Sequence, residues 1–301
     1  MSSPLRLAGR LALVTGATRG IGRAVALAYA KEGAHLILVG RTAGALEEVD
    51  DEIRALGGNA TLLTLDLKNR DKIDALGPTI YQRWEKLDIL VGNAARLGRL
   101  TPLPHFPPDL WQEVFAINVH ANWRLLRALD PLLRASPAGR AIFVTSGITR
   151  ALAAYWGAYA ASKAAVRSYG EGLRGKLKRY GIRVSVICPG YVRTPMTEGN
   201  RYPMPFLMDA GRAARIIQRG LARDRAETDR LVGNHIVILL LVEEREPNQS
   251  HLRMLYRPDL DPSDPAQRAA DVLLEHDDHD DDEVADDVVE DPRDRGQLEP
   301  L

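Results

Sequence analysis

A short apolar run followed by a glycine-rich turn decides the fold: Leu11-Ala-Leu-Val-Thr15-Gly16-Ala-Thr-Arg-Gly20-Ile-Gly22. The turn leads directly into a helical stretch, residues 23–31. Glycine adopts positive φ and lets a ligand approach the backbone, while a helix N-terminus offers free N–H groups to a phosphate. The same turn also suits a tight strand-to-helix connection without a ligand. Its position after the first strand favours a dinucleotide site, although the spacing is Gly-x-x-x-Gly-x-Gly and not Gly-x-Gly-x-x-Gly.

Outward from this turn, short apolar runs alternate with longer amphipathic stretches between residues 11 and 190. This alternation predicts parallel strands joined by crossover helices, and the continuous apolar runs indicate strands buried on both faces. We therefore predict an α/β fold, a Rossmann-type doubly wound parallel sheet, as a single domain over residues 1–257. A loop over 202–208, a helix over 210–223 and a last strand within 232–242 are expected to follow. The main strands are expected at residues 11–15, 36–39, 60–65, 89–92, 141–145 and 183–187.

The chain ends in a strongly acidic segment. From Glu275 onward there are 13 acidic residues and two arginines, a net charge of −11, which cancels a net charge of +11 in the preceding part. Residues 258–301, rich in Asp and Pro, are predicted to form a disordered acidic tail. The run from His276 to Glu283 is expected to be solvated, because repelling carboxylates without a preformed cage bind cations weakly. No metal site is predicted.

The composition limits the partners and the compartment. The single cysteine, Cys188, cannot form an internal disulfide, and the first apolar strand begins by residue 11. We therefore expect a cytoplasmic protein without a signal peptide. The longest apolar run, residues 236–242, is far shorter than a membrane span of about 20 residues, so no membrane association is expected. Lys and Arg are spread along the chain without interleaved aromatic residues, so no nucleic-acid partner is expected.

The end of the second strand bears on cofactor choice. An acidic residue there would hydrogen-bond the ribose 2′-hydroxyl of NAD, but the sequence reads Gly40-Arg41-Thr42. Arg41, together with Arg19 in the glycine turn, suits the 2′-phosphate of NADP, because a planar guanidinium pairs well with phosphate. Two solvated arginines are the alternative. The sequence thus predicts NADP(H) in preference to NAD(H).

Three polar side chains after the fifth strand suggest catalysis. Ser146 ends a buried strand, and Tyr159-Ala-Ala-Ser-Lys163 follows in an expected helix. Positions i and i+4 share a helix face, so the Lys163 ammonium is expected near the Tyr159 phenol, where it would lower the pKa of that phenol and prepare a general acid or base. Ser146 could hydrogen-bond a substrate oxygen as charge develops. Alone, Tyr-x-x-x-Lys is equally an exposed helix pair.

Together with the glycine turn, this pattern resembles the short-chain dehydrogenase/reductase family over about residues 8–195. The resemblance implies that Asn118 is a fourth catalytic residue, which holds a water linking the lysine to solvent. It also implies that Asp66 contacts the adenine and that residues 189–194 hold the nicotinamide amide. The expected catalytic residues are Asn118, Ser146, Tyr159 and Lys163. The expected cofactor contacts are Gly16, Thr18, Arg19, Gly20, Ile21, Gly22, Arg41, Asp66, Leu67, Asn93, Ala94, Tyr159, Lys163, Pro189, Gly190, Val192 and Thr194.

The resemblance implies an oxidoreductase that interconverts a carbonyl and an alcohol. In reduction, NADPH would give hydride to the carbonyl carbon, Tyr159 would give a proton to the oxygen, and Ser146 would stabilise that oxygen. Lys163 would hold the nicotinamide ribose and help to resupply the proton. The alternative is a catalytically silent NADP-binding sensor or scaffold on the same fold, although all four catalytic positions are filled.

The sequence departs from the family pattern in places that bear on the substrate. Gly92-Asn93-Ala94-Ala95 replaces Asn-Asn-Ala-Gly, and residues after about 225 lack the family's usual ending. An apolar set in the region of the family's substrate lid suggests an apolar ketone or aldehyde, a 3-oxoacyl or a steroid-like substrate, with ordinary core packing as an equal alternative. This set is Tyr202, Met204, Phe206, Leu207 and Met208, with Met196 as a further candidate. By resemblance, residues 122–133 and 159–178 would pair with other subunits in a homodimer or homotetramer.

Overall fold

The computed structural model of the chain describes residues 5–149, 155–200, 202–204, 206–222 and 238–240. Within these ranges, seven strands form one sheet in the order β3-β2-β1-β4-β5-β6-β9. The first six are mutually parallel, and β9 runs antiparallel to β6. Their bounds are β1 (Leu11–Thr15), β2 (His35–Gly40), β3 (Asn59–Thr64), β4 (Ile89–Gly92), β5 (Arg140–Val144), β6 (Arg183–Cys188) and β9 (Ile238–Leu240).

The predicted α/β fold is confirmed, and each of the six expected strands matches within one residue at either end. β9 lies inside the region expected to hold the last strand. The predicted domain boundary at residues 257/258 and the acidic tail lie outside the described residues.

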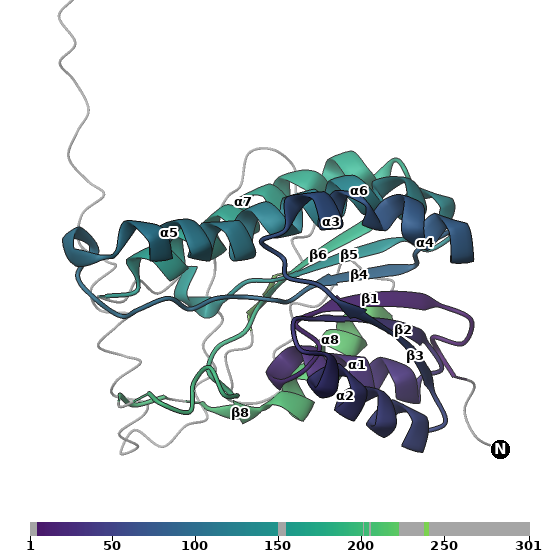
Figure 1. The fold of residues 1–301 in the computed structure, drawn as a ribbon, viewed down its shortest axis with the longest axis horizontal. Coiled ribbons are helices and arrows are strands. Elements are labelled where there is room, and N and C mark those ends of the chain that lie inside the picture. Colours follow the sequence, from purple (N-terminus) through teal and green to yellow (C-terminus); the bar gives the residue numbers. More distant parts are fainter. Residues whose placement is uncertain (1–4, 150–154, 201, 205, 223–237, 241–301) are drawn as a thin grey trace, which may run out of the picture. The chain divides into compact units, whose positions relative to one another are not determined.

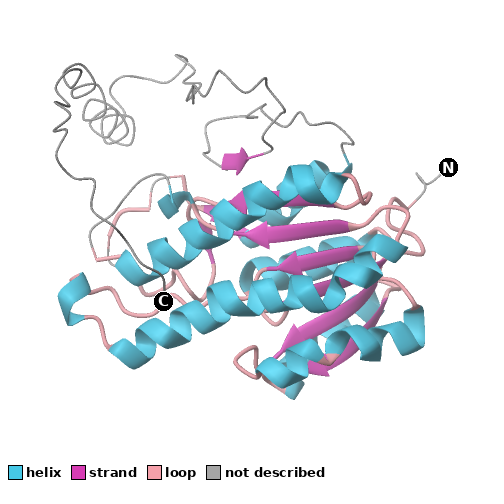
Figure 2. Cartoon of the chain, turned by 90° about the horizontal axis from the view of Figure 1, so that it is seen from above, coloured by secondary structure: helices cyan, strands magenta, loops and turns pink. Residues whose placement is uncertain are grey.

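Helices cover both faces of the sheet (Figure 1). One layer holds α1 (Gly20–Lys31), α2 (Ala43–Ala55) and α8 (Ala210–Ala222). The other holds α3 (Arg70–Asp74), α4 (Leu76–Trp84), α5 (Pro108–Phe115), α6 (Ala121–Ala135) and α7 (Gly157–Lys178). Seen from above, the long helices run alongside the strands, as expected for crossover connections (Figure 2). Among the described residues, no helix combines the length and the apolar character needed to cross a membrane.

Short helical turns and a second, two-stranded sheet connect the main elements. A π-helical turn, η2 (Ala116–His120), joins α5 to α6, and two short 3₁₀ turns are η1 (Leu103–His105) and η3 (Gly147–Thr149). A separate two-stranded sheet pairs β7 (Val192–Arg193) with β8 (Met208–Asp209). β8 falls at the end of the segment that the sequence predicts to be a loop.

The core explains why the strands read as continuous apolar runs. Side chains alternate along a strand, so Leu11 and Leu13 of β1 pack into one buried cluster while Ala12 and Val14 pack into the other. Both clusters are covered by helices, which removes the need for polar residues on either face.

The order of the strands locates the site. The chain adds β2 and β3 on one side of β1 and then returns to add β4 on the other. Two crossovers of opposite direction leave a crevice at the carboxyl ends of β1 and β4, where open α/β sheets bind ligands. The glycine turn follows β1, and Asn93 follows β4.

Candidate active site

The glycine turn between β1 and α1 requires glycine at several positions. Gly16 and Gly20 have φ of +64° and +56°, in the left-handed region. A Cβ on Gly22 would lie 2.2 Å from the Gly16 carbonyl oxygen and 2.5 Å from Asn93 Nδ2. Arg19 is the N-cap residue of α1, and its side chain does not cap the helix. The first N–H groups of α1 therefore remain available to an anion.

Two residues tie this turn to the end of β4. The Thr15 hydroxyl accepts hydrogen bonds from the backbone N–H groups of Asn93 and Ala94, at 2.9 and 3.0 Å. Asn93 Nδ2 in turn donates to the Thr15 carbonyl at 2.9 Å. The sequence pattern singles out Asn93 and Ala94 but not Thr15. The one signal for Thr15 in the sequence is a hydroxyl at the carboxyl end of a buried strand.

The end of β2 lies against the same turn. Ala17 N donates to the Val39 carbonyl at 3.2 Å, and a Cβ on Gly40 would lie 2.8 Å from Thr18 Cγ2. This packing brings Arg41 to the glycine turn that carries Arg19. Both arginine side chains are exposed, and neither forms an ion pair with any described residue. They are therefore able to receive an anionic group.

The expected adenine contacts lie beyond the end of β3. Asp66 is half-buried, and its carboxylate accepts a hydrogen bond from Lys68 N at 2.9 Å. Leu67 beside it is buried. Because β3 pairs with β2, these two residues lie at the same edge of the sheet as Arg41.

The segment after β6 reaches back to the glycine turn. Pro189 accepts a hydrogen bond from Gly147 N at 2.8 Å, which fixes it beside the end of β5. A Cβ on Gly20 would lie 3.0 Å from Thr194 Cγ2. The structure thus brings the segment of residues 189–194 next to the glycine turn and the end of β5.

Ser146, Tyr159 and Lys163 come together at the carboxyl end of β5. The Ser146 hydroxyl is close enough to the Tyr159 phenol to affect its pKa, and Lys163 Nζ lies 5.8 Å from the centroid of the Tyr159 ring. Lys163 Nζ also donates to the Val144 carbonyl at 2.6 Å. Tyr159 and Lys163 are both buried, while Ser146 is half-buried.

Burial shifts the pKa values of both Tyr159 and Lys163. Burial raises the pKa of Tyr159 to about 12, and the nearby Ser146 side chain partly opposes this rise. Burial lowers the pKa of Lys163 to about 8. The expectation that Lys163 lowers the pKa of the phenol is wrong for this structure. Removing the phenol from water disfavours phenolate, and the ammonium is directed at the Val144 carbonyl.

Asn118 is fully buried in the π-helical turn η2 and joins two segments of the site. Its Oδ1 accepts from Arg96 N at 2.7 Å, and its Nδ2 donates to the Arg96 carbonyl at 3.0 Å and to Ser162 Oγ at 2.8 Å. Ser162 Oγ donates to the Tyr159 carbonyl at 2.7 Å. The Asn118 side chain therefore holds α7, which carries Tyr159 and Lys163, against the segment after β4. Ser162 is a further residue that the sequence pattern does not single out.

The residues of the apolar set expected as a substrate lid differ in how deeply they are buried. Met208 is buried with Val192 and Ala213 in a small core, so the packing alternative holds for this residue. Tyr202 is half-buried, and its ring lies 5.9 Å from that of Trp156, centroid to centroid. Met196 is 36% exposed.

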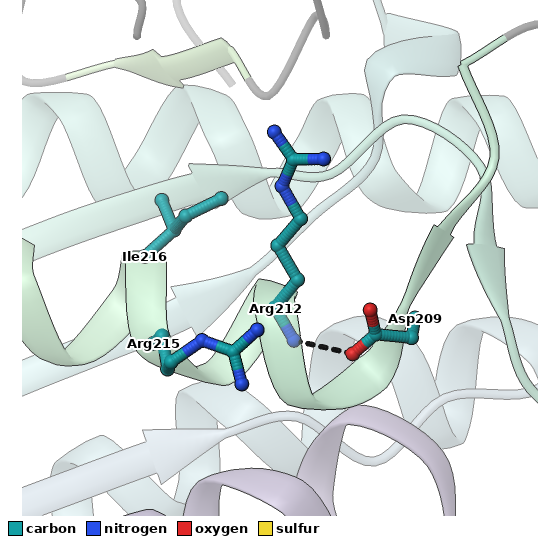
Figure 3. A pocket seen from close by; sticks show the side chains of 4 residues that line it. All are labelled: Asp209, Arg212, Arg215 and Ile216. Atoms are coloured by element: carbon teal, nitrogen blue, oxygen red, sulfur yellow. Dashed lines mark hydrogen bonds between the residues drawn. The ribbon is translucent and has the colours of Figure 1, made fainter. Parts of the chain in front are cut away.

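A hollow of about 450 Å³ lies at the start of α8 (Figure 3). Its lining contains none of the expected catalytic or cofactor residues. The Asp209 carboxylate in it accepts a hydrogen bond from Arg212 N at 2.7 Å and so caps α8. Among the described residues, no group of three His, Cys, Asp or Glu side chains could hold a metal ion. The lining residues are Asp209, Arg212, Arg215 and Ile216.

Comparison with known proteins identifies the family. The sequence profile described as short chain dehydrogenase matches residues 10–204, which include the glycine turn, Ser146, Tyr159 and Lys163. The chain belongs to the short-chain dehydrogenase family. It is an oxidoreductase that acts on CH–OH groups with a nicotinamide dinucleotide as hydride acceptor.

Several relatives of this short-chain dehydrogenase are known. The 1-deoxy-11-beta-hydroxypentalenate dehydrogenase of Streptomyces exfoliatus is 31% identical over 280 residues, which are 90% of this chain and 100% of the relative. A short chain dehydrogenase from Escherichia coli CFT073, solved with NADPH, is 35% identical with a TM-score of 0.67 and covers 73% of this chain and 92% of its own. An NAD⁺-bound xylitol dehydrogenase is 25% identical, also with a TM-score of 0.67, and covers 73% and 94%.

Proposed function

We propose that this protein is an NADP(H)-dependent dehydrogenase or reductase that interconverts a carbonyl and an alcohol with Tyr159 as general acid and base. The observation that carries the proposal is the meeting of the Tyr159 phenol, the Ser146 hydroxyl and the Lys163 ammonium at the carboxyl end of β5. This is the edge of the sheet where such folds bind their ligands. An apolar ketone or aldehyde, including 3-oxoacyl and steroid-like compounds, is the substrate class that the aromatic and apolar surroundings support best.

The residues of the glycine turn fit a dinucleotide cofactor. A side chain on Gly22 would clash with the backbone of the turn, and the N-terminal N–H groups of α1 have no side-chain cap. Gly16, Gly20 and Gly22 would receive the pyrophosphate, Asp66 the adenine, and residues 189–194 the nicotinamide amide. When bound, the cofactor supplies or accepts the hydride. An NADPH-bound relative supports the choice of NADP, and an NAD⁺-bound relative keeps NAD as the alternative.

Side chains of the protein supply the proton that the carbonyl oxygen receives. Because the pKa of Tyr159 is about 12, its Oη carries a proton at neutral pH and is ready to donate it to a carbonyl oxygen. Ser146 Oγ can hydrogen-bond the same oxygen and hold it near the phenol. Lys163, with a pKa of about 8, is mostly protonated at neutral pH, so its ammonium can resupply a proton after Tyr159 has donated one.

Exchanging Arg41 for Asp tests the choice of cofactor. The carboxylate would repel the 2′-phosphate of NADP but could accept a hydrogen bond from the ribose 2′-hydroxyl of NAD. We expect the KM for NADPH to rise by roughly tenfold or more, while the KM for NADH stays equal or falls, since a charge-assisted contact is worth about 1.5–3 kcal/mol. Steady-state kinetics with both cofactors gives the answer. Arg70→Asp, the same charge change at an exposed position, is the control; an unchanged preference in Arg41→Asp would mean that Arg41 is only solvated.

The lowered pKa of Lys163 predicts that both the rate of carbonyl reduction and the stability of the protein depend on pH. As pH rises through about 8, Nζ loses its proton, so kcat for carbonyl reduction should fall by up to tenfold per pH unit. In the unfolded chain this lysine keeps its ordinary pKa of 10.5 and binds more protons between pH 8 and 10 than the folded protein does. Stability contributed by this group therefore rises with pH in that window. The rate profile and urea unfolding from pH 6 to 10 measure both effects; a flat profile through pH 8 would contradict this role.

We also propose that α6 and α7 pair with a second copy of the chain. Trp123 of α6 is 47% exposed, with the guanidinium groups of Arg124 and Arg127 over its ring at 5.6 and 5.3 Å. Large exposed aromatic side chains and arginines are enriched in protein interfaces. Sedimentation velocity should show a dimer or larger species that Trp123→Glu dissociates; a wild-type monomer would exclude the assembly.

A further inference from the structure

Three aromatic side chains from three different segments form a series of ring contacts that begins at Tyr159. Trp156, which is the residue before α7, packs edge-on against both Tyr159 and Tyr202, with centroids 5.9 Å apart in each pair. Tyr191, which precedes β7, packs against Tyr202 at 6.1 Å. We call Trp156, Tyr191 and Tyr202 the aromatic wall. It connects the expected nicotinamide segment to the phenol that is proposed to donate the proton.

The burial of these side chains shows which of them is able to meet a ligand. Tyr159 is 8% exposed, while Trp156, Tyr191 and Tyr202 are all half-buried. Each side chain of the aromatic wall is therefore partly accessible, and Trp156 directly contacts the ring of the buried Tyr159. Trp156 packs edge-to-face against two rings, which restricts its position, and ordered aromatic surface is well suited to contact flat apolar groups.

The surroundings of Trp156 extend the apolar surface. Tyr155 and Leu103 are 59% and 55% exposed, respectively. The carbonyl of Tyr155 accepts a hydrogen bond from Thr101 N at 3.2 Å, and a Cβ on Gly157 would lie 3.0 Å from Leu103 Cδ1. These contacts place Tyr155 and Leu103 next to Trp156. A ligand that carries several hydroxyl groups would bury many of them against ring faces and methyl groups, which form no hydrogen bonds, and would have only the tyrosine hydroxyls and the Trp156 indole N–H as partners.

We propose, building on the carbonyl–alcohol reaction above, that the aromatic wall makes this enzyme selective for substrates whose reacting carbonyl belongs to or adjoins a fused, apolar ring system. Trp156 and Tyr202 are the residues that determine this specificity, and small open-chain or polyhydroxylated carbonyls are disfavoured. The rings would contact the carbon skeleton while the carbonyl oxygen points at Tyr159 and Ser146.

The test compares 2-tetralone, a fused bicyclic ketone, with 2-butanone, a small open-chain ketone. The wild type should have the higher kcat/KM for 2-tetralone. Trp156→Ala and Tyr202→Ala should each lower the ratio of the two kcat/KM values by roughly tenfold, since each removes a ring contact. Tyr202→Phe is the matched control: it keeps the ring and removes only a hydroxyl whose oxygen is buried, so the ratio should stay at the wild-type value. Unchanged ratios in both alanine variants would overturn the proposal.

A binding measurement separates the aromatic wall from the proposed reaction. 2-Naphthol has the fused ring and the oxygen but cannot be oxidised to a simple ketone, so its affinity for the NADP⁺-loaded protein does not depend on turnover. Calorimetry should show binding to the wild type and Tyr202→Phe, weakened by roughly tenfold in the two alanine variants. If the wild type reduces no ketone but the four proteins bind 2-naphthol in this pattern, the proposed reaction is refuted while the proposed ligand contact with the aromatic wall is supported. If 2-naphthol binds all four proteins equally, the proposed contact between the ligand and the aromatic wall is refuted. NADPH affinity and circular dichroism verify that each variant is folded.

Discussion

Tyr159→Phe is expected to lower kcat/KM for carbonyl reduction by about 10³-fold, within the range of roughly 10²–10⁴-fold that a positioned general acid supplies. The phenyl ring keeps the edge-on contact with Trp156, so the loss would report on the hydroxyl and not on packing. The hydroxyl is needed because it holds the proton that the carbonyl oxygen must receive, and burial keeps that proton in place at neutral pH.

Tyr155→Phe is the matched control for this prediction. Tyr155 lies four residues earlier and is 59% exposed, so removal of its hydroxyl should leave kcat/KM within about twofold of wild type. Steady-state NADPH consumption, together with the Kd for NADPH from fluorescence, measures both variants. A Tyr159→Phe protein that binds NADPH and turns over at the wild-type rate would show that another group donates the proton.

Gly22→Val is expected to have the second large effect, through cofactor binding. A Cβ at this position meets the Gly16 carbonyl oxygen at 2.2 Å and Asn93 Nδ2 at 2.5 Å, so the turn must move to admit any side chain. Overpacking of this kind costs about 1–3 kcal/mol, and valine adds two methyl groups to the clash. We expect the Kd for NADPH to rise by roughly 100-fold and the melting temperature to fall.

Gly44→Val is the control for the turn. A Cβ on Gly44, in the first turn of α2, would meet nothing within 4 Å, so substitution there should leave the Kd for NADPH unchanged. Isothermal titration with NADPH and thermal unfolding of both variants test the pair. Wild-type affinity in Gly22→Val would mean that the cofactor does not depend on the geometry of this turn.

Much of the fold could be predicted because the strands are buried on both faces. A strand with apolar side chains on both faces, such as Leu11–Thr15, reads as a continuous run whose ends are marked by polar or glycine residues. Helix starts were harder to place. α1 begins at Gly20 and not at residue 23, so the end of the glycine turn overlaps the first turn of the helix, although Gly20 itself has a left-handed φ.

The gathering of Ser146, Tyr159 and Lys163 could be expected from spacing, but their titration could not. The direction of the Tyr159 pKa depends on how deeply the phenol is buried and on where the Lys163 ammonium points, both of which are set by tertiary packing. The roles of Thr15 and Ser162 could not be predicted from the sequence for a related reason. Their partners, Asn93 and Asn118, are 78 and 44 residues away, and serine and threonine are too common for such a pairing to be visible in one sequence.

The central claim, that this protein moves a hydride between NADPH and a carbonyl carbon, is tested most directly by isotope transfer. The wild type is incubated with NADPH carrying deuterium at C4 of the nicotinamide and a panel of apolar ketones and aldehydes, and the products are analysed by mass spectrometry. We predict an alcohol with one deuterium on its carbinol carbon, formed by the wild type and not by Tyr159→Phe. If NADPH binds and yet keeps its deuterium with every carbonyl offered, the account is contradicted and a cofactor-sensing role is the better explanation.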